Sequence, residues 1–233
     1  MNPPSGFSET PFCGVATESI VGMDLVGVVC GQDTLCCRSP SRHTARRDDN
    51  ELNAEPRTAK TAWTGRDMTV SVVVGNPKPR SRTYQAANLV AERLVDRAPD
   101  FVLDLADVAA ALVDWSSAEV AALVGEVQAS SIVIFASPTY KGSYTGLLKL
   151  FLDRFGSGAF AGLTAAVPLM LGGDLRHALA PEVFLKPVLS ELGASCPTRG
   201  LFVLEADYLG SPSIDSWLEA SRPLLAPWAA AVR

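Results

Sequence analysis

The residues best suited to chemistry gather in short segments that each follow an apolar run. The first segment, residues 75–83 (GNPKPRSRT), has one glycine and no GK[ST], so it is neither a Walker loop nor a G-x-G-x-x-G loop. It does place Ser81, Arg82, Thr83 and free backbone N–H groups at the start of an expected helix. Such a helix start suits a single phosphate group. A plainly capped helix with solvated arginines is the alternative, and the segment alone does not decide between them.

Two further segments have the composition of binding loops. Residues 137–146 (SPTYKGSYTG) contain two tyrosines, a lysine and two glycines. Tyr140 and Tyr144 would usually be packing aromatics, but this mixture suits a binding loop better than a core. The third segment, residues 172–174 (GGD), allows a ligand to approach the backbone closely.

The elements around these segments alternate between strand and helix. The strands are expected at residues 70–74, 101–105, 132–136, 164–171 and 201–204. The helices are expected at residues 83–97, 117–128, 144–155, 185–192 and 214–228, the last interrupted by two prolines. This alternation predicts an α/β fold with a doubly wound parallel sheet. Because ligands of such sheets bind at the carboxyl ends of the strands, the three segments are expected to lie together.

Composition excludes several functions. Twenty Lys and Arg against 25 Asp and Glu give a net charge of −5, which argues against a nucleic-acid partner. No apolar run approaches the roughly 18 residues that span a bilayer, so no membrane association is expected. With only two histidines and no C-x-x-C spacing, we expect no metal site.

The first 67 residues differ from the rest of the chain. They hold four of the five cysteines, and residues 31–66 show neither helical nor strand periodicity. We therefore expect a disordered extension over residues 1–67 and one compact domain over residues 68–233. The apolar stretch at 20–30 is interrupted by Asp24 and lacks a preceding basic residue, so it does not resemble a signal peptide. A cytoplasmic location with reduced cysteines is expected.

A longer pattern within this domain resembles a known family. Residues 138–146 (PTYKGSYTG), followed by Leu148-Lys149 and Asp153, resemble the NAD(P)H-dependent FMN reductases. The likeness is greatest to the reductase component of alkanesulfonate monooxygenase systems. It covers about residues 69–230 and includes Gly172-Gly173, His177 and residues 185–192 (LKPVLSEL).

This resemblance implies a flavodoxin-like three-layer sandwich, with a five-stranded parallel sheet between helices, that binds FMN. By position, the phosphate would be held by Ser81, Arg82 and Thr83. The isoalloxazine and ribityl groups would be lined by Pro138, Thr139, Tyr140, Lys141, Gly172, Gly173 and Asp174. Asn76 stands where the family usually has serine, but its amide still offers a donor and an acceptor.

Tyr144 has a separate implied role. In the alkanesulfonate-type reductases, a tyrosine here resembles an inserted residue that makes a π-bulge at a subunit interface. We expect Tyr144 to stack near the flavin across that interface and to favour flavin exchange. The alternative is an ordinary packing aromatic.

The implied activity is reduction of FMN by NADPH or NADH, with reduced flavin passing to a partner monooxygenase. No catalytic residue is expected, because hydride passes directly between the cofactors. A homodimer or homotetramer is implied as well. Two alternatives remain: a quinone or azo-compound reductase that keeps its FMN bound, and a flavodoxin-like electron carrier without reductase activity.

Overall fold

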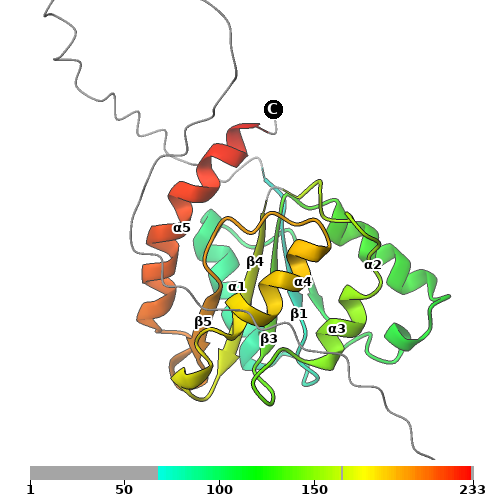
Figure 1. Cartoon of the computed structure of the whole chain (residues 1–233), viewed down its shortest axis with the longest axis horizontal. Helices are drawn as coiled ribbons and strands as arrows, with labels where there is room; N and C mark the ends of the chain where they lie inside the picture. Colours follow the sequence, from blue (N-terminus) through cyan, green and yellow to red (C-terminus); the bar gives the residue numbers. More distant parts are fainter. Residues whose placement is uncertain (1–67, 164, 232–233) are drawn as a thin grey trace, which may run out of the picture. The chain divides into compact units, whose positions relative to one another are not determined.

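The computed structural model of the chain describes residues 68–163 and 165–231, and Figure 1 shows their arrangement. The expected disordered extension over residues 1–67 lies outside the described residues and stays a prediction. Within the described residues, no helix is both long and apolar enough to cross a membrane.

Five parallel strands form one sheet in the order β2-β1-β3-β4-β5. The strands are β1 (Val70–Val74), β2 (Phe101–Asp104), β3 (Ile132–Pro138), β4 (Ala165–Gly172) and β5 (Leu201–Leu204). The helices are α1 (Arg82–Val95), α2 (Ala118–Gln128), α3 (Gly146–Leu152), α4 (Lys186–Glu191) and α5 (Pro212–Ala231). The predicted alternation of strands and helices is confirmed.

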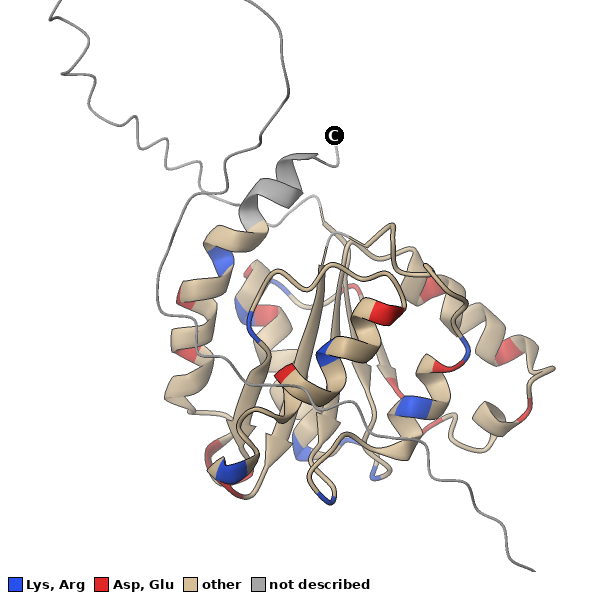
Figure 2. Cartoon of the chain, in the orientation of Figure 1, with Lys and Arg blue, Asp and Glu red and all other residues tan. Residues whose placement is uncertain are grey.

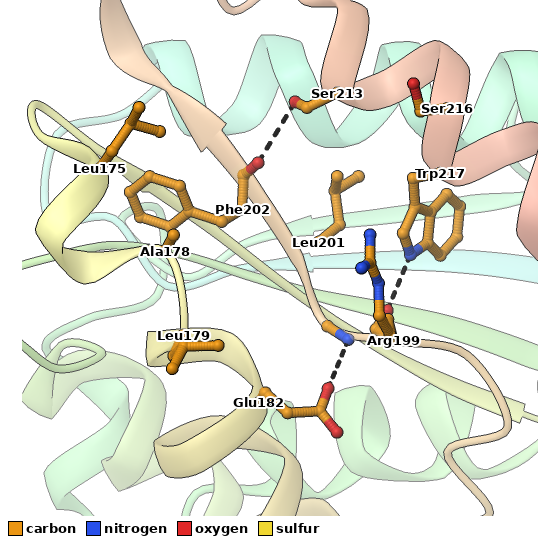
Figure 3. A pocket seen from close by; sticks show the side chains of 11 residues that line it. Leu175, Ala178, Leu179, Glu182, Arg199, Leu201, Phe202, Ser213, Ser216 and Trp217 are labelled. Atoms are coloured by element: carbon orange, nitrogen blue, oxygen red, sulfur yellow. Dashed lines mark hydrogen bonds between the residues drawn. The ribbon is translucent and has the colours of Figure 1, made fainter.

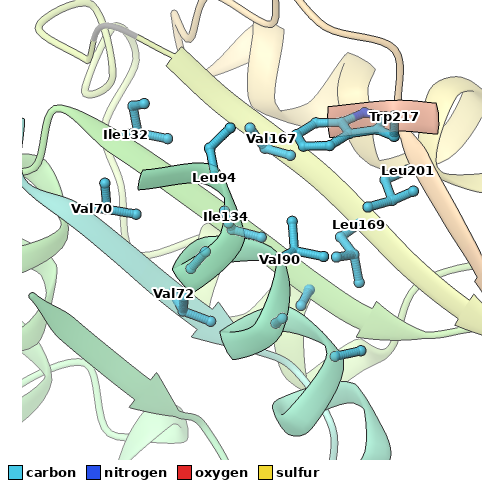
Figure 4. Packing of buried hydrophobic residues seen from close by; sticks show 14 of the residues in the cluster. Val70, Val72, Val90, Leu94, Ile132, Ile134, Val167, Leu169, Leu201 and Trp217 are labelled. Carbon is cyan, nitrogen blue, oxygen red and sulfur yellow. The ribbon is translucent and has the colours of Figure 1, made fainter. Parts of the chain in front are cut away.

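Two hydrophobic clusters cover the two faces of the sheet. On one face, α1 packs against β1, including Val70 and Val72, and α5 packs against β5, within the cluster drawn in part in Figure 4. On the other face, α2, α3 and α4 pack against side chains that include Val73. Because both faces are buried, β1 is apolar at every position except Ser71, as is typical of a parallel strand. The predicted three-layer sandwich is therefore confirmed.

Some element boundaries differ from the prediction. Strand β3 continues to Pro138, because Ser137 and Pro138 are still in register with β4. Helix α3 begins at Gly146, after the cap residue Thr145, and not at residue 144. Helix α5 is continuous through Pro223, where an interruption was expected. A proline removes one backbone hydrogen bond and bends a helix, but it does not have to end it.

A short π-helical turn, η3 (Pro181–Leu185), leads directly into α4. Its first residue is Pro181, whose missing N–H would have no intrahelical acceptor at that position. The π-bulge expected at Tyr144 is absent there, because Tyr144 precedes α3 and lies outside any helix. That part of the prediction is wrong.

Candidate functional site

The three predicted loops meet at the carboxyl edge of the sheet. Strands β1 and β3 are neighbours, although the chain passes through β2 at one side before it returns to β3. This reversal creates the position where sheets of this type bind ligands. Backbone hydrogen bonds join the loops to neighbouring strands: Gly75 N donates to Ala136 O at 2.7 Å, and Thr139 N donates to Leu171 O at 2.6 Å. Lys and Arg residues occur in the loops at this edge (Figure 2).

Thr145 connects the first two loops, a role that sequence reasoning did not find. Its buried hydroxyl donates to Gly75 O at 2.5 Å and accepts from Leu148 N at 3.1 Å, which caps α3. Its own N–H donates to Ser137 Oγ at 3.0 Å. The approach is so close that a Cβ on Gly75 would lie 2.4 Å from the Cβ of Leu148. The loop after β1 is therefore held against the start of α3.

Two of the three residues predicted for phosphate binding, Ser81 and Thr83, lie together at the start of α1. Ser81 is the N-cap, and its Oγ accepts from Tyr84 N at 3.3 Å. Thr83 Oγ1 accepts from Asn76 Nδ2 at 3.1 Å, and both side chains are buried. A hydroxyl that accepts one hydrogen bond still has its own hydrogen to donate. The backbone N–H groups of Arg82 and Thr83 also lie in the first helical turn, where they have no intrahelical acceptor.

Arg82, the third residue predicted for phosphate binding, forms an ion pair with another residue. Its guanidinium lies 3.3 Å from the carboxylate of Glu205, which follows β5, and both side chains are about half exposed. Arg80, which the prediction omitted, is bound to Asp104 and Asp107 instead. The pKa of Arg80 is raised above its usual value by hydrogen bonds from its guanidinium, of which the one to Asp107 has the larger effect and the one to Asp104 the smaller.

The second loop forms a tight turn that exposes Tyr140 and Lys141. Tyr140 N donates to Ser143 O at 2.9 Å, and Ser143 N donates to Tyr140 O at 3.2 Å. The enclosed residues, Lys141 and Gly142, both have positive φ, at 54° and 86°. Two such residues in succession define a type I′ turn, in which lysine is unusual. The turn places the exposed Tyr140 and Lys141 side chains at the rim of the site.

Tyr144 packs against the hydrophobic cluster that also contains Phe151 of α3. We expect Tyr144→Ala to lower the free energy of unfolding by about 1–3 kcal/mol, because it removes a partly buried ring. The variant should also retain flavin more strongly, because the expected role of the Tyr144 ring is to favour flavin exchange. Chemical denaturation and flavin titration measure the two effects, and Tyr144→Phe, which keeps the ring, is the control. Unchanged flavin retention and oligomeric state in Tyr144→Ala would contradict the flavin-stacking role.

The third loop closes on the second. A Cβ on Gly172 would lie 2.7 Å from Phe202 Cζ and 3.2 Å from Thr139 Oγ1, so a larger residue there would have to displace the Phe202 ring. The Thr139 hydroxyl is buried and has no hydrogen-bond partner. A buried polar atom without a partner is costly, so it indicates a place where a ligand atom can bind. Gly173 beside it is exposed.

Asp174 begins the short helix η2 (Leu175–His177). Its carboxylate accepts from Arg176 N at 2.8 Å and from the Arg176 guanidinium at 2.7 Å. These bonds lower the pKa of Asp174 to about 2, so its charge persists at neutral pH. Asp174 is therefore a negative charge at the edge of the site.

The predicted residues line open loops, and a separate cavity of about 500 Å³ lies along β5 between η2, η3 and α5 (Figure 3). The Trp217 indole donates to Arg199 O at 2.7 Å, and Glu182 accepts from Gly200 N at 2.7 Å. The cavity approaches the third loop at Leu175, which follows Asp174, and at Phe202 of β5, which lies beside Gly172. It is distinct from the site formed by the three loops.

Comparison with known proteins shows which family this chain resembles. Residues 68–208 match the family model described as NADPH-dependent FMN reductase. An FMN reductase (NADPH) of Pseudomonas aeruginosa is 32% identical over 67% of this chain and 84% of its own length. The NADH-dependent FMN reductase SfnF of Pseudomonas fluorescens is 29% identical over 61% of this chain and 80% of its own.

Solved structures agree with the sequence relatives. The apo form of an NADH:FMN oxidoreductase aligns with a TM-score of 0.61 and 28% identity, covering 70% of this chain and 89% of that chain. An oxidoreductase from Corynebacterium diphtheriae has the same fold, with a TM-score of 0.59 and 22% identity over 70% of this chain and 96% of that chain.

Proposed function

The chain belongs to the NADPH-dependent FMN reductase family, and we propose that its three loops hold FMN for reduction by a nicotinamide nucleotide. The reaction class is NAD(P)H-dependent reduction of FMN, which agrees with the expected activity. Hydride transfer from nicotinamide to flavin is chemistry that the two cofactors supply. The protein therefore contributes binding, orientation and electrostatics.

The pair of buried hydroxyls at the start of α1 carries this proposal. Ser81 and Thr83 each accept one hydrogen bond inside the protein, so that each retains a hydrogen to donate to a phosphate oxygen. The N–H groups of the first turn of α1 add further donors for an anion. Asn76 acts through Thr83, because its amide fixes the direction of that hydroxyl.

The flavin ring would lie between the second and third loops. The buried Thr139 hydroxyl is a free donor for a polar flavin atom, and Gly172 leaves the space that a side chain would fill. The exposed backbone of Gly173 and the Tyr140 side chain border the same space. Arg82 can turn toward the phosphate only if its guanidinium leaves Glu205.

We further propose that FMN is a substrate which leaves after reduction and reaches a partner monooxygenase. Support comes from the open character of the site: Tyr140 is 53% exposed, and Lys141, Gly173 and Asp174 are also exposed. Loops that leave the ring edge in solvent favour exchange over permanent retention. A homo-oligomer, as the family resemblance implies, would add contacts at this rim.

Initial rates of NADPH and NADH oxidation at varied FMN test whether the flavin is a substrate. We expect the full chain to purify with little bound flavin and to show saturable dependence on added FMN. A yellow protein would contradict the proposal if its turnover ignored added FMN and responded to quinone or azo acceptors.

A further inference from the structure

A buried carboxylate lies beside the phosphate loop without belonging to it. Asp104 ends β2, where it is in register with Val74 of β1, and its side chain is 1% exposed. One carboxylate oxygen accepts from both Arg80 N and Arg80 Nη1, each at 2.9 Å. The other oxygen accepts from Ala106 N at 3.4 Å. Two of the three hydrogen bonds that the Asp104 carboxylate accepts therefore come from Arg80, in the loop after β1.

Arg80 has the backbone conformation that this arrangement requires. Its φ is 51°, a left-handed value that is uncommon for a residue with a Cβ. Its second guanidinium nitrogen lies 2.9 Å from Asp107, and its guanidinium carbon is 5.0 Å from the centre of the Tyr84 ring. Strained backbone persists where surrounding contacts determine it, often at functional sites.

These contacts fix the entry to α1. Arg80 directly precedes Ser81, so the direction in which the chain leaves Arg80 sets the position of the Ser81 hydroxyl and the first helical N–H groups. Tyr84, under the guanidinium, donates its N–H to that same hydroxyl. Both terminal nitrogens of the Arg80 guanidinium are already paired with carboxylates, which separates its role from that of a phosphate ligand.

We propose that Asp104 and Arg80 form a latch that holds the loop after β1 in its phosphate-binding conformation. The latch thereby sets how strongly the protein distinguishes FMN from riboflavin, which lacks the phosphate. Both are positioning residues, since neither needs to touch the flavin. The inference rests on the proposed function, because it assumes that the start of α1 receives the FMN phosphate.

Flavin binding by Asp104→Asn tests the latch. Titration of the full chain with FMN and with riboflavin, followed by flavin fluorescence, gives both dissociation constants. We expect the Kd for FMN to rise about tenfold, the size of effect that loss of a charge-assisted hydrogen bond produces. The Kd for riboflavin should change less than about twofold, because the Asp104 carboxylate bonds only to Arg80 of the phosphate loop and to Ala106 N just after β2.

Asp107→Asn gives a second test if Asp104→Asn does not fold, because Asp107 is about half exposed. It removes one of the two carboxylates that hold Arg80, and we expect FMN binding to weaken about threefold. Asp215→Asn is the control, since it breaks an Arg93–Asp215 pair between α1 and α5, far along the chain from the loop. It should leave both dissociation constants unchanged.

Whether the Kd for FMN rises or falls in these variants decides between the latch and a direct role of Arg80 in binding the phosphate. If Arg80 is itself a phosphate ligand restrained by the carboxylates, Asp104→Asn and Asp107→Asn will bind FMN more tightly. Tighter binding, unchanged FMN affinity, or an equal loss for both flavins would each overturn the latch. A wild-type protein with no preference for FMN over riboflavin would instead contradict the phosphate site and hence the proposed function.

Discussion

Replacing Gly75 with alanine is expected to lower the free energy of unfolding by about 1–3 kcal/mol and to weaken FMN binding about tenfold or more. The new Cβ would lie 2.4 Å from the Cβ of Leu148 and 3.1 Å from its Cα. Side-chain rotation cannot move either atom, so the loop after β1 must separate from α3. That separation breaks the Thr145–Gly75 hydrogen bond and shifts the Ser81 region.

Gly125→Ala is the matched control for this substitution. Gly125 lies inside α2, and a Cβ there would have no heavy atom within 4 Å. Alanine should therefore raise the free energy of unfolding by up to about 1 kcal/mol and leave FMN binding unchanged. Chemical denaturation and FMN titration of both variants give the comparison. A Gly75→Ala protein as stable as wild type would show that the loop does not depend on its close approach to α3.

Thr145→Val should have the next largest effect on stability and on FMN binding. Valine has nearly the same shape but no hydroxyl, so α3 loses its N-cap, at a cost of about 1 kcal/mol. The Gly75 carbonyl also loses its buried partner, at a cost of about 1–3 kcal/mol. We expect the free energy of unfolding to fall by about 2–4 kcal/mol, with weaker FMN binding because the first two loops are no longer joined.

Thr145→Ser separates the hydroxyl from the methyl group. Serine caps helices as well as threonine does, and it can still donate to the Gly75 carbonyl. It should therefore keep most of the stability and the FMN affinity of the wild type. If Thr145→Ser and Thr145→Val lost stability equally in urea denaturation, packing of the methyl group would explain the effect better than the hydroxyl.

The sheet and the place where the three candidate loops meet were predictable from local sequence. Strands buried on both faces are short continuous apolar runs, such as residues 132–136, and the alternation with helices requires a parallel sheet. A parallel sheet with a reversal in strand order has one ligand-binding edge. That rule was sufficient to bring the loops containing Ser81, Tyr140 and Gly172 together.

Contacts between distant residues were not predictable in the same way. The Thr145 hydroxyl reaches Gly75, 70 residues earlier, and Arg80 reaches Asp104 only because β1 and β2 pair in one register. No local pattern contains that register. A signal for Thr145 did exist, since a threonine before an apolar helical run is a typical N-cap.

The π-helical turn shows the same limit. The stripe of apolar residues at 185–192 indicated a helix, but its period did not reveal that the preceding turn has π geometry. Placing the irregularity at Tyr144 relied on family resemblance, and this chain has it at Pro181–Leu185 instead. Resemblance therefore predicted the fold and the reaction class better than it predicted this local feature.

Anaerobic mixing of the full chain with FMN and NADPH tests most directly whether this protein itself reduces FMN. We expect the visible absorbance of oxidised FMN to disappear at a rate proportional to protein concentration, without any other reductase. NADH in place of NADPH shows which nucleotide is preferred. FMN that stays oxidised with both nucleotides, and is bleached only after a separate reductase is added, would contradict FMN reductase activity and indicate an electron carrier.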